Sequence, residues 1–321
     1  MKTKIDIFSG FLGAGKTMLI KKLLSEKLQN ENIVIIENEF GEVGIDGSIL
    51  RKSNIEVKEI NAGCICCTVS SDFNEAIKEV IEKYKPSRII IEPSGVGKLS
   101  DVINVCKGEQ IKKFAELNMI ITVVDGLKYD AYIKNFSEFY KNQIQNANTL
   151  VISRSQKLSL EKLVNLVEKL QKINHKAKII TTPWDSINGA KIVTIGESKN
   201  KEDNLEGINL VKKPIGTARV NTTLNHKANE VFQTVGIETP KVFDRISLQN
   251  FLERMEKNKA YGTVIRAKGI VETEENKWIQ FDYVPEEFQI RDSHAEYTGR
   301  VCIIGSGLNK EAIRNLFLSS K

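Results

Sequence analysis

Gly10-Phe11-Leu12-Gly13-Ala14-Gly15-Lys16-Thr17 fits G-x-x-x-x-G-K-[ST], the pattern of the phosphate-binding loop (P-loop) of nucleotide hydrolases. The apolar run Ile5-Asp6-Ile7-Phe8 before it is typical of a strand, and apolar residues at helical spacing follow it. In such a unit, glycines let backbone N–H groups close around phosphate oxygens, and the helix N-terminus adds partial positive charge. The alternative is a glycine-rich turn before an ordinary helix, and the full pattern in this context favours the P-loop.

The P-loop pattern predicts a role for each polar residue in it. Lys16 is expected to reach the β- and γ-phosphates of a nucleotide, and Thr17 to ligate Mg²⁺. The predicted nucleotide-binding residues of this segment are Gly10, Gly13, Ala14, Gly15, Lys16, Thr17 and Met18.

The composition is that of an ordinary globular protein, with 321 residues, of which 41% are hydrophobic and 27% charged. The net charge of +6 comes from lysines spread along the chain, which argues against a nucleic-acid partner. No apolar run approaches the roughly 18 residues of a membrane span, so no membrane partner is expected. Because Met1-Lys2-Thr3-Lys4 leads directly into the first strand, we expect no signal peptide and a cytoplasmic location.

Strand and helix patterns alternate in the first half of the chain. This predicts an α/β fold, a P-loop NTPase parallel sheet with helices on both faces. The expected strands are Ile5–Ser9, Ile33–Glu37, Ile55–Ile60, Arg88–Glu92, Met119–Asp125, Thr149–Ser153 and Lys178–Thr182. The expected helices include Met18–Gln29, Phe73–Tyr84 and Glu161–Lys172.

The pattern changes near Asp185, which predicts three regions. Residues 1–190 form the nucleotide-binding domain, 191–225 a linker or excursion, and 226–321 a smaller α+β domain. That last domain is expected to begin with the segment Val231–Ile237, followed by a helix at Leu248–Lys257. Strands are expected at Thr263–Glu272, Lys277–Tyr283 and Arg300–Ile304, and a final helix at Lys310–Leu318.

Acidic residues follow two of the expected strands. Glu92-Pro93-Ser94-Gly95 places an acid at a buried strand end, where a P-loop fold has its second Mg²⁺ contact, and Gly95 can bring a backbone N–H near the γ-phosphate. The segment from Glu37 to Asp46 carries four acids in ten residues. It includes Glu39, which we assign to the catalytic residues as a group that orients water. For each segment the alternative is a structural or solvated acidic turn.

Three of the five cysteines lie within Cys64-Ile65-Cys66-Cys67. Thiolates are soft ligands that suit zinc and similar metals, and three of them on one turn leave a fourth position open. Buried core cysteines are the alternative interpretation, but this clustering favours metal or redox chemistry.

A P-loop, E-N-E-F-G-E, G-C-I-C-C and E-P-S-G, in this order and spacing, resemble the CobW-like GTPase family, whose relatives insert nickel during urease and hydrogenase maturation. The resemblance covers most of the chain, since Thr263–Leu318, with R-A-K-G-I and C-I-I-G, is similar to that family's C-terminal domain.

The resemblance implies a nucleotide-gated metallochaperone. GTP and Mg²⁺ would bind Gly10–Thr17 and Glu92, and Zn²⁺ or Co²⁺ would bind Cys64, Cys66 and Cys67, assisted by Glu37 and Glu42. The implied partners are a client metalloprotein or a corrinoid-dependent protein.

One departure concerns the base. Where the family's guanine-reading N-K-x-D is expected, this chain has Ser153-Arg154-Ser155-Gln156. A neutral Gln156 cannot accept both charge-assisted hydrogen bonds that an aspartate accepts from guanine, although Arg154 can still lie along the base. Trp184 follows the last expected strand and is a candidate to stack on the base, the alternative being ordinary packing.

Three functions remain open at this point. The first is a slow GTPase that delivers a metal or a metal cofactor. The second is a nucleotide-switched binding module with a structural zinc, and the third is an ATP-using client activator.

Overall fold

The computed structural model describes residues 2–37, 56–59, 70–198, 231–275, 277–285 and 287–318. These residues divide into two compact units, one within the first 198 residues and one from residue 231 onward. Among the described helices, none is both long and apolar enough to cross a membrane.

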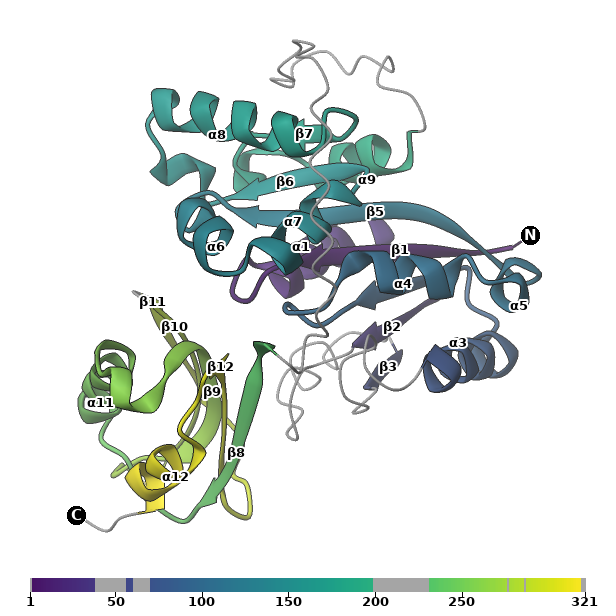
Figure 1. The fold of residues 1–321 in the computed structure, drawn as a ribbon. Coiled ribbons are helices and arrows are strands. Elements are labelled where there is room, and N and C mark those ends of the chain that lie inside the picture. Colours follow the sequence, from purple (N-terminus) through teal and green to yellow (C-terminus); the bar gives the residue numbers. More distant parts are fainter. Residues whose placement is uncertain are drawn as a thin grey trace. The chain divides into compact units, whose positions relative to one another are not determined.

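The first unit is built on a parallel sheet of seven strands in the order β3-β2-β4-β1-β5-β6-β7 (Figure 1). The strands are β1 (Thr3–Gly10), β2 (Ile33–Glu37), β3 (Glu56–Glu59), β4 (Arg88–Glu92), β5 (Ala115–Asp125), β6 (Thr149–Ser153) and β7 (Lys178–Ile180). β1, β2 and β4 are buried almost throughout, as expected for strands covered on both faces. The predicted P-loop NTPase sheet is confirmed.

The α-helices of this unit are α1 (Lys16–Leu23), α3 (Ser70–Tyr84), α4 (Leu99–Cys106), α5 (Glu109–Lys112), α6 (Tyr129–Asn135), α7 (Ser137–Gln145), α8 (Leu160–Ile173) and α9 (Gly189–Glu197). The described residues of this unit also include three short turns: the π-helical η1 (Leu24–Leu28) and the 3₁₀ turns η2 (Ser155–Lys157) and η3 (Trp184–Ser186). The predicted helix Met18–Gln29 is therefore α1 continued by a π-helical turn.

Alternate residues of the strands face the two layers of helices. Phe8 and Ile90 belong to a core cluster with apolar residues of α1, η1 and α9, while α7 packs on β1 and β5. α9 begins at Gly189 and runs past residue 191, where the sequence placed the start of a linker. Because Ile192, Val193 and Ile195 are buried in this cluster, the first part of that predicted linker is a core helix of the first unit.

The second unit is an antiparallel sheet of five strands in the order β11-β10-β9-β12-β8. Its elements are β8 (Gln233–Thr239), α11 (Arg245–Lys257), the 3₁₀ turn η4 (Lys259–Tyr261), β9 (Thr263–Glu272), β10 (Trp278–Val284), β11 (Glu287–Ser293), β12 (Gly299–Ser306) and α12 (Lys310–Leu318). Side chains of α11 and α12 form one core with the sheet. The predicted smaller α+β unit is confirmed, with β11 as an edge strand that was not predicted.

Candidate functional site

Three glycines shape the loop between β1 and α1. Gly10, Gly13 and Gly15 have positive φ angles of 144°, 70° and 101°. Side chains other than glycine rarely adopt such angles, and a Cβ at Gly15 would lie 2.7 Å from Trp184. The glycines therefore let the chain turn tightly from the end of β1 into α1, as the phosphate-binding pattern requires.

The positive end of α1 opens onto this loop. Gly15 caps the helix without a side-chain hydrogen bond, and no acid lies in the first turn. Lys16 is buried, and its Nζ donates a hydrogen bond to the Phe11 carbonyl at 3.5 Å, so the ammonium folds back over the loop. Ala14 is buried in the core, and Met18 is exposed. The helix end and the lysine together provide a positive environment suited to an anion.

The predicted magnesium residues lie in contact. Oγ1 of Thr17 donates to Glu92 and lies 3.0 and 3.1 Å from its two carboxylate oxygens. Glu37, which ends β2, is the register partner of Glu92 on β4, so both carboxylates project from the same face of the sheet. The Thr17 hydroxyl and the Glu92 carboxylate are oxygen donors of the kind that Mg²⁺ prefers.

Arg154 connects the loop after β6 to the P-loop. Its guanidinium donates to the carbonyl oxygen of Gly13 at 3.2 Å and pairs with the carboxylate of Asp125 at 2.9 Å. Asp125 ends β5 and also accepts hydrogen bonds from the N–H groups of Leu127 and Lys128. Burial raises the pKa of Asp125, and the charge of Arg154 opposes that rise. Arg154 thus holds the predicted base-reading loop against the P-loop.

The residues around Arg154 differ in exposure. Ser153 is buried and donates to the carbonyl of Val124 at 3.4 Å, so its hydroxyl is bound within the sheet. Gln156 is exposed on η2. The geometry therefore keeps Gln156 accessible, and base reading by Ser153 and Gln156 stays a prediction.

Trp184 and Gly95 both pack against the P-loop. The Trp184 ring lies against Gly15 and the core cluster that contains Ala14. A Cβ on Gly95 would lie 2.9 Å from the backbone nitrogen of Leu12, so only glycine fits there without a shift. These contacts are structural, and the predicted contacts of Trp184 and Gly95 with nucleotide stay predictions.

The predicted metal residues Cys64, Cys66, Cys67 and Glu42 lie outside the described residues, as does Glu39, the predicted catalytic acid. Within the part of the chain that the structure describes, no group of three or more histidine, cysteine, aspartate and glutamate side chains is arranged to hold a metal ion. The zinc site thus stays a prediction, supported by the soft thiolate donors of its sequence.

Three residues that contact the predicted loops were not predicted from the sequence: Asp125, Tyr132 and Gln143. Asp125 ends an apolar strand as Glu92 does, and that signal was available. The hydroxyl of Tyr132 donates to the carbonyl of Leu12 at 3.3 Å, a contact that depends on how α6 packs. No local sequence pattern distinguishes Tyr132 or Gln143.

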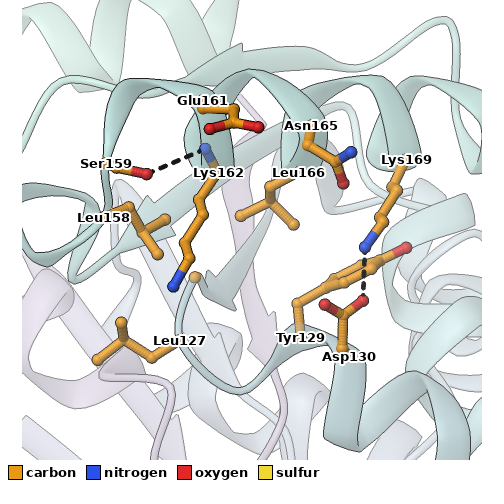
Figure 2. A pocket seen from close by; sticks show the side chains of 11 residues that line it. Leu127, Tyr129, Asp130, Leu158, Ser159, Glu161, Lys162, Asn165, Leu166 and Lys169 are labelled. Carbon is orange, nitrogen blue, oxygen red and sulfur yellow. Dashed lines mark hydrogen bonds and ion pairs between the residues drawn. The ribbon is translucent and has the colours of Figure 1, made fainter.

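A pocket of about 390 Å³ lies between the turn after β5, the start of α6 and the face of α8 that extends to Lys169 (Figure 2). On its wall, Nζ of Lys169 pairs with Asp130 at 2.7 Å, and Ser159 caps α8 by accepting the Lys162 N–H at 3.3 Å. None of the predicted nucleotide-binding residues lines the pocket. We therefore do not assign it to the nucleotide site.

Two family models match the chain. Residues 4–181 match the CobW/HypB/UreG nucleotide-binding domain, and residues 232–321 match the cobalamin synthesis protein cobW C-terminal domain.

Similar proteins include a zinc chaperone, YeiR of Escherichia coli strain K12, 31% identical over 159 residues. That match spans 50% of this chain and 48% of YeiR, so the chain spans about half the length of this relative. The zinc-regulated GTPase metalloprotein activator 1 of Schizosaccharomyces pombe is 25% identical over 316 residues, covering 89% of this chain and 76% of that protein. The zinc-bound crystal structure of the E. coli YjiA GTPase aligns with a TM-score of 0.48 and 19% identity, covering 99% of this chain and 98% of that one.

Proposed function

The chain belongs to the CobW/HypB/UreG family, and on that premise we propose that it binds and slowly hydrolyses a nucleoside triphosphate, with GTP as the expected substrate, and couples this to handling zinc. The triphosphate would bind the P-loop between Gly10 and Thr17. Three thiolates, Cys64, Cys66 and Cys67, would bind the metal, with Glu37 and Glu42 as further acidic ligands. A client metalloprotein would receive the ion.

One observation carries the nucleotide part of the proposal: Thr17 contacts Glu92 across the mouth of a glycine-shaped loop. The loop, the positive end of α1 and Lys16 suit a phosphate tail, and the Thr17–Glu92 pair suits Mg²⁺. Bound Mg²⁺ would neutralise charge on the phosphates during transfer to water. Glu39 is the acid that we propose to orient that water.

The metal part of the proposal rests on the cysteine cluster and on the names of the relatives. Two of the relatives are named as a zinc chaperone and as a zinc-regulated GTPase metalloprotein activator. The cysteines follow β3, and β3 pairs with β2, the strand that ends at Glu37. A metal held there would be coupled to nucleotide if it bound one conformation of the intervening loops better than another.

The test is reciprocal linkage. Affinity for GTP is measured by calorimetry with and without Zn²⁺, and affinity for Zn²⁺ with and without GTP, both in the presence of Mg²⁺. We expect each ligand to change the affinity of the other by the same factor. Lys16→Ala should abolish triphosphate binding, and Cys66→Ser combined with Cys67→Ser should abolish the zinc effect while triphosphate binding persists. If Zn²⁺ leaves the affinity for GTP unchanged and GTP leaves the affinity for Zn²⁺ unchanged, the coupling is rejected.

A second candidate, an ATP-using client activator, is favoured by the exposed Gln156 in place of the expected aspartate. The amide of glutamine can pair with the N1 and N6 positions of adenine, whereas a carboxylate suits guanine. Competition between GTP and ATP for the wild-type protein decides between the two candidates.

A further inference from the structure

Helix α7 holds the turn that follows Glu92. Gln143 is fully buried, and its Nε2 donates to the carbonyl oxygens of Gly95 and Gly97, at 3.0 and 2.9 Å. The main-chain carbonyl of Gln143 accepts a hydrogen bond from the buried Thr122 of β5 at 2.9 Å. Gln143 is therefore fixed to the central sheet through its main-chain carbonyl and to the turn through its side-chain amide.

Two more residues of α7, Asn142 and Glu138, contact the same segment. Oδ1 of Asn142 accepts the N–H of Ser100 at 3.1 Å, and its Nδ2 donates to the Ser100 hydroxyl at 3.0 Å. Glu138 forms an ion pair with Lys98 at 2.7 Å. Residues from Gly95 to Ser100 are thus attached to α7 along most of its length.

The P-loop also contacts α7, and it contacts the preceding helix α6. The buried Phe11 ring packs against Tyr132 of α6 and Tyr140 of α7, with centroids 4.6 and 5.7 Å apart. Tyr132 also donates to the carbonyl of Leu12. Because Gly95 itself lies on Leu12, the α6–α7 pair sets the position of the turn relative to the P-loop on which it rests.

The amide of Gln143 is not saturated. Its Oε1 is buried and has no hydrogen-bond partner among the described residues. A buried acceptor left unpaired is unfavourable, so a shift of the turn that offers it an N–H would be favoured. The turn contains the Gly95 peptide, whose N–H is predicted to lie near a γ-phosphate.

We propose that Gln143 is a positioning residue for nucleotide sensing: through Gly95 and Gly97 it sets where the turn lies, and so how far the protein prefers a triphosphate over a diphosphate. This rests on the proposed nucleotide site. Gln143 touches neither the phosphates nor the metal in this scheme, and it acts through the glycine peptides.

The test compares Gln143→Met, which keeps the size of the side chain and removes both donors, with Thr122→Val. The control is matched, since it removes a buried hydrogen bond to Gln143 itself and leaves the amide on the turn. Calorimetry with Mg²⁺ measures affinity for GDP and for a non-hydrolysable GTP analogue. We expect the triphosphate preference to fall about tenfold in Gln143→Met and to stay at the wild-type value in Thr122→Val.

A lower melting temperature with an unchanged triphosphate preference would mean that Gln143 is only structural, which overturns the inference. If Gln143→Met does not fold, hydrogen exchange of the wild-type protein decides. Amides from Gly95 to Gly97 should exchange more slowly with the triphosphate analogue than with GDP, and equal rates would overturn the inference. Wild-type protein that binds no triphosphate would instead reject the proposed function, so the two failures are distinguishable.

Discussion

The Thr17 hydroxyl and the Glu92 carboxylate lie in contact, and both stand on regular elements, the first turn of α1 and the end of β4. Because those elements pack in one core, the scaffold itself holds the two oxygen donors close together. Such support from the scaffold is what a precise cation site needs.

Thr17→Val tests this pair. Valine keeps the shape of the side chain and removes the oxygen, so the gain in triphosphate affinity on adding Mg²⁺ should fall about tenfold or more. Calorimetry with and without Mg²⁺ measures this gain. Thr17→Ser is the matched control and should retain it, and a valine variant with full magnesium dependence would remove Thr17 from the site.

Gln156→Asp tests the reading of the base. Restoring a carboxylate should raise the preference for GTP over ATP about tenfold to hundredfold, because charge-assisted hydrogen bonds to N1–H and the 2-amino group become available. Competition of the two nucleotides is measured for wild type, Gln156→Asp and Gln156→Ala. If the aspartate variant prefers GTP over ATP no more strongly than the alanine variant does, residue 156 does not contact the base.

At the scale of residues, the sequence predicted side chains that belong to a motif and missed those that act through packing. Thr17 and Glu92 were predicted because strand and helix ends carry recognisable residue types, and the structure brings them together. Gln143 is an ordinary polar residue on a short helix, and its role depends on a turn 48 positions away. A contact of that separation has no local signature.

Among the elements, α9 is attached to the amino ends of the central strands by a polar network. Glu197, at the end of α9, accepts hydrogen bonds from Lys4, Arg88 and Asn118 at 3.0–3.1 Å. Arg88 is buried and also pairs with Asp6. Partial burial raises the pKa of Glu197, but these three donors outweigh it, so the pKa lies below its ordinary value of 4.5.

We therefore expect Glu197→Gln to lower the free energy of unfolding by about 1–2 kcal/mol at neutral pH, because the buried guanidinium loses part of its charge compensation. A carboxyl whose pKa is lowered on folding stabilises the protein above its unfolded pKa, and this is lost as the pH falls through the folded value. The difference from wild type should shrink below about pH 4. Urea unfolding across pH measures it. Glu168→Gln, at an exposed site on α8, should change little, and a difference that persists in acid would contradict the charge argument.

The strands of the first unit were predicted because they are near-continuous apolar runs, and the longer helices because apolar residues recur at helical spacing. The apolar strands of both units were predicted within a few residues. β11, Glu287–Ser293, was missed because an edge strand carries mostly polar side chains. Short helices such as α6 and α7 were also missed, since each spans too few turns to show a clear period. The cysteine turn lies outside the described residues, so the predicted metal site stays a prediction.

For the whole molecule, each of the two units has its own buried core. All the predicted nucleotide-binding residues lie in the first unit. The chain has two tryptophans, and each unit contains one: Trp184 beside the P-loop, and Trp278 on β10. Fluorescence of single-tryptophan variants therefore reports on the two units separately.

We expect the two units to unfold in separate thermal transitions, because each has a core of its own. Triphosphate and Mg²⁺ at a hundred times the dissociation constant should stabilise the first unit by about 2.7 kcal/mol. The transition reported by Trp184 in Trp278→Phe protein should then rise by several degrees, while that reported by Trp278 in Trp184→Phe protein stays unchanged. Adding Lys16→Ala should abolish the rise. If both tryptophans instead report one shared transition, whose melting temperature rises on adding the ligand, the two units unfold together and the ligand stabilises both.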